Sequence, residues 1–122
     1  MASPNIANLS SIVGVTSATL SVSPTSGSIV LNTPATNHVY KINTVMAANK
    51  TATSAYITLT LNRNSTTSYY LAYQMPIPGN ASIVLMGKDN PLYMMDTQSD
   101  ILSATTATAS AIDVFVSYED IS

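Results

Sequence analysis

The sequence predicts an all-β protein, an antiparallel β-sandwich or jelly roll of about eight strands. Short runs of alternating apolar and polar residues recur along the chain, which is the period of a half-buried strand. Turn-forming Pro, Gly, Asn and Asp separate these runs about every 8 to 12 residues, and no apolar segment keeps helical spacing for more than a turn or two. The 122 residues suffice for one core, and no internal repeat indicates a propeller or solenoid.

We expect residues 1–10 to form an N-terminal arm and residues 11–122 a single β-sandwich domain. Ser3-Pro4 is an acceptable helix start, and Ile6 and Leu9 follow at helical spacing. A segment this short with two Asn makes a poor helix, so an extended arm or a single turn is expected. It would dock on the sandwich or on a neighbouring subunit.

The first strands are expected between residues 11 and 46. Residues 11–22 fit one long strand or two short ones, with Gly14 as a bulge or bend. Ser28–Leu31 reads as a short strand. The segment from His38 to Met46 reads as another, with one face formed by Tyr40, Ile42, Thr44 and Met46.

The densest apolar material lies between Ala55 and Met86, which reads as three consecutive strands. In the first strand the core-facing residues are Ile57, Leu59 and Leu61. In the second, Ser68–Ile77, alternation assigns to the core Tyr69, Leu71, Tyr73, Met75 and Ile77. The third, Ala81–Met86, has four consecutive apolar residues and is expected to be covered on both faces, by the opposite sheet and a loop or by a neighbouring subunit.

Two further strands are expected after Met86. Leu92–Met95 follows a strong turn signal, and residues 111–118 alternate cleanly. In that last run the core-facing residues are Ile112, Val114, Val116 and Tyr118. Between these strands, Ile101-Leu102 precedes a low-complexity run of Ser, Ala and Thr at residues 103–110.

The low charge of the chain indicates a protein that associates. Only 8% of residues are charged, against about 25% in an ordinary domain, while the chain holds 17 Ser and 16 Thr. A formal net charge of −2 gives little repulsion between copies, so we expect other subunits to cover much of the surface. The alternative is a secreted or extracellular-type β-domain that is simply rich in Ser and Thr.

Composition argues against several other classes of protein. Four basic residues are too few for a phosphate-tracking patch, so no nucleic acid is expected. No run approaches the roughly 20 apolar residues needed to span a membrane, and the start lacks the pattern of a signal peptide, so we expect a soluble chain without a membrane partner. The absence of Cys excludes disulfides and thiol sites.

The sequence predicts no enzyme, cofactor or metal. His38 is the single histidine, and no Gly-x-Ser-x-Gly nucleophile motif accompanies it. Asp96 and Asp100 are the nearest approach to an acidic cluster, but their spacing lacks the calcium-loop pattern. We therefore expect these two carboxylates to be solvated on the surface. Basic residues concentrate in the first half and acids in the second, a polarity that would orient subunits head to tail.

Outward-facing aromatic residues are the candidate interaction sites. Alternation places Tyr56, Tyr70 and Phe115 on the solvent side of their strands, and interface cores favour such residues. With Ile6 and Leu9 of the arm, they are the expected contact residues between subunits. The alternative is a Tyr platform that stacks sugar rings.

Several segments together resemble a group of small virion proteins of tailed bacteriophages, including phages of cyanobacteria. They are the opening Met-Ala-Ser-Pro-Asn-Ile6, Val45-Met-Ala-Ala-Asn49, Ile77-Pro-Gly-Asn-Ala-Ser-Ile-Val-Leu85, Lys88-Asp-Asn-Pro-Leu-Tyr93 and Asp113-Val-Phe-Val-Ser-Tyr-Glu-Asp-Ile-Ser122. The resemblance spans nearly the whole chain and implies β-sandwich components of the head, neck, baseplate or fibre. It transfers no catalytic residue.

The resemblance implies a structural virion protein, made in the host cytoplasm. We expect a capsid decoration or cement subunit that acts as an oligomer, a trimer, and binds other virion proteins such as the major capsid protein. The alternative function is a carbohydrate-binding or adhesin module at a tail tip, fibre or baseplate, with the Tyr cluster and the loop from Asp96 to Asp100 contacting glycans.

Overall fold

The computed structural model describes residues 12–19, 22, 28–64, 66–87, 89, 92–107 and 111–122. These residues form nine β-strands: β1 (Ile12–Thr19), β2 (Ser28–Leu31), β3 (Val39–Asn49), β4 (Ala55–Arg63), β5 (Thr67–Ile77), β6 (Ser82–Met86), β7 (Leu92–Met95), β8 (Ile101–Thr106) and β9 (Ile112–Ile121). The expected arm at residues 1–10, with Ile6 and Leu9, lies outside the described residues.

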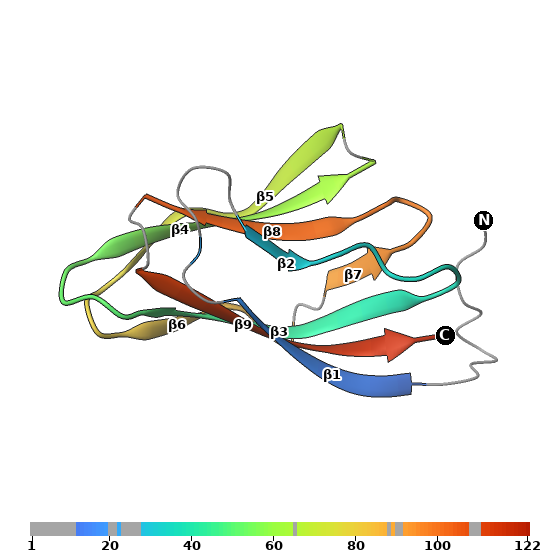
Figure 1. The fold of residues 1–122 in the computed structure, drawn as a ribbon, viewed down its shortest axis with the longest axis horizontal. Helices are drawn as coiled ribbons and strands as arrows, with labels where there is room; N and C mark the ends of the chain where they lie inside the picture. Colours follow the sequence, from blue (N-terminus) through green and yellow to red (C-terminus); the bar gives the residue numbers. More distant parts are fainter. Residues whose placement is uncertain are drawn as a thin grey trace.

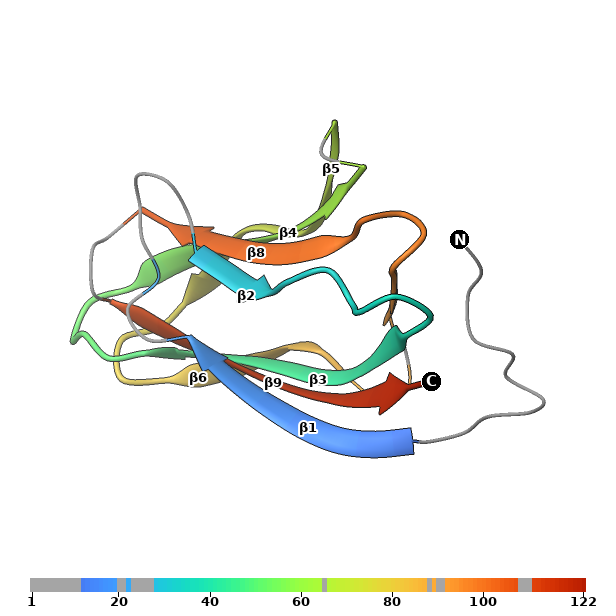
Figure 2. The same ribbon diagram turned by 45° about the vertical axis from the view of Figure 1, so that its right-hand side comes forward.

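The strands form two antiparallel sheets that pack face to face (Figures 1 and 2). The five-stranded sheet has the order β1-β9-β3-β6, with β7 also paired to β3, and the four-stranded sheet has the order β2-β8-β4-β5. The predicted all-β sandwich is therefore confirmed. Within the described part of the chain no segment is helical, so none offers an apolar helix long enough to cross a membrane.

The strand pairs are nested along the chain. β4 pairs with β5, β3 with β6 and β7, β2 with β8, and β1 with β9. β6 and β7 pair with successive parts of β3, Val45–Ala48 and Val39–Ile42, and so act as one interrupted strand. Each outer pair therefore joins segments that are far apart in the sequence.

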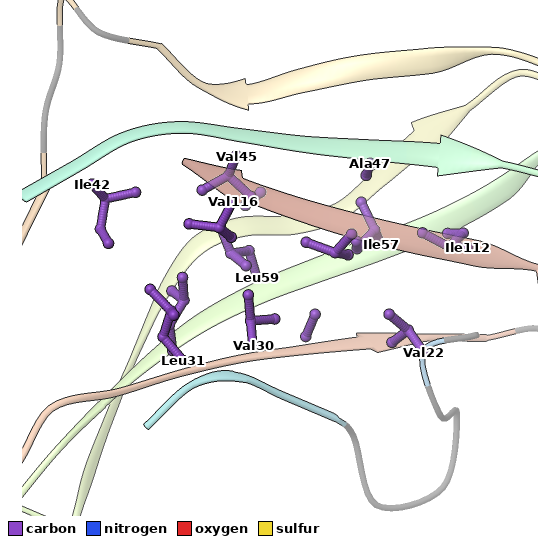
Figure 3. Packing of buried hydrophobic residues seen from close by; sticks show 14 of the residues in the cluster. Val22, Val30, Leu31, Ile42, Val45, Ala47, Ile57, Leu59, Ile112 and Val116 are labelled. Carbon is purple, nitrogen blue, oxygen red and sulfur yellow. The ribbon is translucent and has the colours of Figure 1, made fainter. Parts of the chain in front are cut away.

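The core lies between the two sheets (Figure 3). Ile42, Val45 and Val116 of the five-stranded sheet face Ile57 and Leu59 of the four-stranded sheet, and all five are fully buried. The alternation predicted for β4 and β9 is confirmed, because Leu61, Ile112 and Val114 are also buried and Tyr118 packs against the core. Burying each such side chain stabilises the fold by about 1.5 to 3 kcal/mol.

The face predicted for β3 is wrong in its second half. The register with β9 shifts between Ile42 and Thr44, which is a β-bulge. A bulge adds one residue and reverses which side chains face inward. Val45 is therefore buried, whereas Met46 lies on the outer surface.

The expected faces of β5 and β6 also need correction. Of the five β5 residues assigned to the core, only Ile77 is buried. β5 is an edge strand, and its hairpin with β4 rises away from the two sheets (Figures 1 and 2). β6 is likewise an edge strand, and its Val84 is 59% exposed, so the opposite sheet and a loop do not cover both of its faces. Cover by a neighbouring subunit, the other possibility, stays a prediction.

Two smaller differences concern β1 and β8. β1 pairs with β9 without a register shift, so Gly14 is not a bulge. The low-complexity run after Leu102 belongs to β8, which pairs with both β2 and β4. Ala104 and Thr106 of that run are buried, so small residues fill this part of the core.

Two loops at one end of the sandwich are fastened by the buried side chain of Asn49. Its amide nitrogen donates to the carbonyl oxygens of Thr53, Ile77 and Pro78 at 2.8, 3.0 and 3.3 Å. Its Oδ1 accepts from the backbone N–H of Thr51 at 2.9 Å. These bonds connect the β3–β4 loop to the end of β5.

Candidate interaction surfaces

The tyrosine surface lies on the β4–β5 hairpin. We use this name for Tyr70 and Tyr73, which are both exposed; Tyr69 and Leu71 beside them are exposed too, but the register sets Tyr69 opposite the core-facing Leu61. The rings of Tyr70 and Tyr73 meet edge to face, with centroids 4.9 Å apart. The two residues are 62% and 63% exposed, so neither is covered by the part of the chain that the structure describes. Exposed aromatic groups of this kind are enriched at protein interfaces.

Two register shifts give β5 this unusual exposure. Between Ile57 and Thr60, four residues of β4 lie opposite six residues of β5, from Tyr70 to Met75. Gln74 lies at the shift between Ile57 and Leu59, where its backbone is in the left-handed region with φ at 47° and its N–H donates to Oγ1 of Thr58 at 3.0 Å. Bulges twist an edge strand and redirect its side chains, so more β5 residues face solvent than simple alternation allows.

A hollow of about 550 Å³ lies beside these bulges, on the outer face of the four-stranded sheet. It is lined by Tyr56, Thr58, Gln74, Thr105, Thr106 and Ala107. Tyr56 is half exposed, so its ring is accessible at this hollow. The expectation that Tyr56 and Tyr70 face outward is confirmed.

The outer face of the five-stranded sheet carries an apolar row. The register aligns Ala18 of β1, Phe115 of β9, Met46 of β3 and Val84 of β6 across four strands. We call these four residues the Phe115 row. Phe115 is 46% exposed, as expected from alternation. Part of the row borders a largely apolar hollow of about 490 Å³.

The expected contact residues therefore fall on opposite sides of the molecule. Tyr56 and Tyr70 lie on the outer face of one sheet and Phe115 on the outer face of the other, with the core between them. Sequence reasoning missed Met46 and Val84, because the β3 bulge and the edge position of β6 expose them. Sequence reasoning also missed Gln74. The nearby prolines, Pro76 and Pro78, predicted only where the strand ends.

Asp96 and Asp100 are buried, contrary to the expectation that they are solvated. Arg63 donates from Nε and Nη2 to the two oxygens of Asp100, and this hydrogen bonding raises the pKa of Arg63. Asp96 accepts the backbone N–H of Asn37 at 2.7 Å. Both carboxylates thus hold turns of the sandwich together, and neither is placed to contact a glycan.

Two further contacts, a hydrogen bond and an ion pair, connect segments that are far apart in the sequence. His38 Nδ1 lies 2.6 Å from Oδ1 of Asp120, and Lys50 Nζ lies 2.9 Å from Oδ1 of Asp113. Like Arg63 with Asp100, each contact joins a His, Lys or Arg to an acid nearer the C-terminus. Basic and acidic side chains from different parts of the sequence therefore pair with each other within a single chain, at Lys50–Asp113 and Arg63–Asp100.

Two tyrosines pack beside the His38–Asp120 pair. The rings of Tyr40 and Tyr118 are tilted, with centroids 4.7 Å apart. The pKa of Tyr118 is raised mainly by burial and to a smaller extent by the charge of Asp120. The pKa of Tyr40 is raised mainly by burial, and further by Tyr118 and Asp120. Among the described residues, no three His, Cys, Asp or Glu side chains gather as a metal site.

No protein-family model matches the chain, and no relative was found among the curated proteins.

Proposed function

We propose that the protein is a structural subunit of a tailed-phage virion, a capsid decoration or cement protein that works by contact with neighbouring subunits. The observation that carries this proposal is the pair of exposed apolar surfaces on opposite faces, the tyrosine surface and the Phe115 row. A free monomer rarely exposes large apolar patches, which usually mark interaction sites. The resemblance to small virion proteins supports the same function.

The strand topology supports this proposal. The nested pairs and the sheet orders β1-β9-β3-β6 and β2-β8-β4-β5 fit a jelly roll, if β6 and β7 count as one strand. Jelly rolls are frequent among viral capsid and lectin domains. We therefore infer a jelly-roll fold for the chain, although this topology alone assigns no function.

The opposite positions of the two surfaces favour contacts between unlike surfaces. A contact of this head-to-tail kind closes into a ring when the rotation between subunits allows it. We propose that the tyrosine surface of one copy packs on the Phe115 row of the next, and that the ring is a trimer. No residue of the tyrosine surface or the Phe115 row is charged. Packing one surface on the other therefore buries no unpaired charge from these residues, which would be costly. Surfaces left open on the ring would bind the major capsid protein.

Mixing two variants tests the proposed contact. Tyr70→Asp should disable the tyrosine surface and Phe115→Asp the Phe115 row, so each variant alone should sediment as a monomer. An equimolar mixture should form a 1:1 complex and nothing larger, because only one intact pair of surfaces remains. Thr36→Asp, at an exposed loop position, is the control for added charge and should assemble like the wild type.

Other outcomes would overturn the contact or the function. If like surfaces paired, Tyr70→Asp or Phe115→Asp alone would still self-associate. A wild-type chain that stays monomeric at high concentration would remove the assembly role. The number of copies per virion then shows where in the particle the protein lies. Hundreds of copies indicate the shell, and about six to eighteen indicate the neck or baseplate.

A further inference from the structure

The hollow beside Tyr56 adjoins the tyrosine surface, because Gln74 directly follows Tyr73, but Tyr56 itself lies outside that surface. The hollow lies where β4, β5 and β8 run side by side, whereas Tyr70 lies farther along the hairpin, opposite Thr60. Tyr56 and Thr60 are four positions apart in β4, about 13 Å along a strand. A molecule in the hollow need not touch the hairpin tip.

The lining of the hollow combines one accessible aromatic ring with uncharged polar groups. Tyr56 supplies the ring, Thr58 and Thr105 supply hydroxyl groups, and Gln74 supplies an amide that both donates and accepts hydrogen bonds. Among the residues that the structure describes, none that lines the hollow is charged. The volume, about 550 Å³, is within the usual range of small-molecule sites. Such a lining suits a neutral ligand that has many hydroxyl groups and an apolar ring face.

The backbone at Gln74 gives an independent sign of a binding site. A left-handed conformation is uncommon for a residue other than Gly, and strained residues of this kind cluster at ligand sites. The bulge and the bond to Thr58 hold Gln74 in this conformation. Gln74 thereby lines the hollow together with Tyr56, which comes from the neighbouring strand.

We propose that this hollow binds a neutral saccharide, with a sugar ring against Tyr56 and hydroxyl groups hydrogen-bonded to Gln74 and the two threonines. The loop from Asp96 to Asp100 takes no part, because its two carboxylates are buried and engaged within the chain. The site goes beyond assembly, since it would allow an assembled particle to adhere to a polysaccharide.

An array of neutral cello-, malto-, xylo-, manno- and galacto-oligosaccharides tests the site, followed by calorimetry with the strongest binder. Tyr56→Ala should weaken binding by about tenfold or more, since it removes the ring. Gln74→Gly should weaken it similarly, because it deletes the amide while glycine readily keeps the left-handed backbone. Tyr93→Ala, which removes an exposed tyrosine of the five-stranded sheet, should leave binding unchanged.

Three results would overturn the saccharide site. One is that no neutral oligosaccharide binds the wild type at millimolar concentration. Another is that Tyr56→Ala and Gln74→Gly bind as tightly as the wild type. The third is that an acidic polymer such as heparin binds while neutral sugars do not. Sedimentation of Tyr56→Ala distinguishes a failure of the saccharide site from a failure of the subunit contact. The variant should lose saccharide binding but associate like the wild type.

Discussion

Asp100 is completely buried beneath Arg63, which donates to its two oxygens at 2.8 and 2.9 Å. The same carboxylate accepts the backbone N–H of Met95 at 3.0 Å. Beside the pair, the backbone N–H of Asn64 donates to the carbonyl oxygen of Gln98. The turn of the β4–β5 hairpin is thereby fixed to the turn before β8, and this holds in place the part of β5 that carries the tyrosine surface.

Removing Arg63 should therefore destabilise the fold more than neutralising Asp100. Arg63→Met leaves a buried carboxylate without its partner, a change that costs about 3 to 5 kcal/mol of unfolding free energy. Asp100→Asn should cost less, because the partly exposed Arg63 side chain can turn to solvent. Urea unfolding of both variants measures the difference, and the reverse order would contradict this account.

Asn49→Ala should destabilise the end of the sandwich that holds the β3–β4 loop. The change removes the donor to three carbonyl oxygens and the acceptor for Thr51, so we expect a loss of about 2 kcal/mol or more. Asn32→Ala, at an exposed position, is the matched control and should change the unfolding free energy little. Equal losses in the two variants would show that Asn49 does not fasten these loops.

Gly79→Ala should destabilise the protein, whereas Gly14→Ala should not. A Cβ at position 79 would lie 2.2 Å from the carbonyl oxygen of Ala52, and this backbone contact can be relieved only by moving the loop. We expect a cost of about 1 to 3 kcal/mol, as for other overpacked sites. A Cβ at Gly14 meets no atom within 4 Å. Thermal unfolding of both variants compares them, and a harmless Gly79→Ala would refute the close approach of the two loops.

Stability should fall at alkaline pH because of Tyr40 and Tyr118. Burial raises the pKa of both above the ordinary value of 10.0, so the folded state holds these protons more tightly than the unfolded state. Their contribution is complete below about pH 9 and is lost as the pH rises through the raised values. Melting temperatures across this range should fall less steeply in Tyr118→Phe than in the wild type. Tyr93→Phe is the control, and an unchanged slope in Tyr118→Phe would contradict the assignment.

Alternation predicted the strands that run through the middle of their sheets and remain regular. Ile57 and Leu59 of β4 and Val114 and Val116 of β9 are buried as expected, because an opposite sheet covers them along their length. The same reasoning failed for Met46, where a bulge reverses the faces of β3. A bulge depends on the pairing of two strands, so one strand's sequence does not reveal it.

The candidate surfaces were predicted only in part. Tyr56, Tyr70 and Phe115 are exposed as expected, but their positions on opposite faces follow from the sheet order, which alternation does not contain. The burial of Asp100 has the same origin, since its partner Arg63 is brought to it by the fold. Ala104 was overlooked in β8 because a small side chain gives little hydrophobic signal even where it fills the core.

The last strand in the sequence, β9, lies between β1 and β3 in the five-stranded sheet. While the ribosome is still making β9, β1 has no neighbour in that sheet with which to pair. β1 and the edge of β3 that pairs with β9 must therefore wait, with their backbone groups open to aggregation, until β9 has been made. A premature stop codon before Ile112 would remove the strand that joins the two ends of the chain, so its product should be cleared by proteases instead of folding into a smaller sandwich.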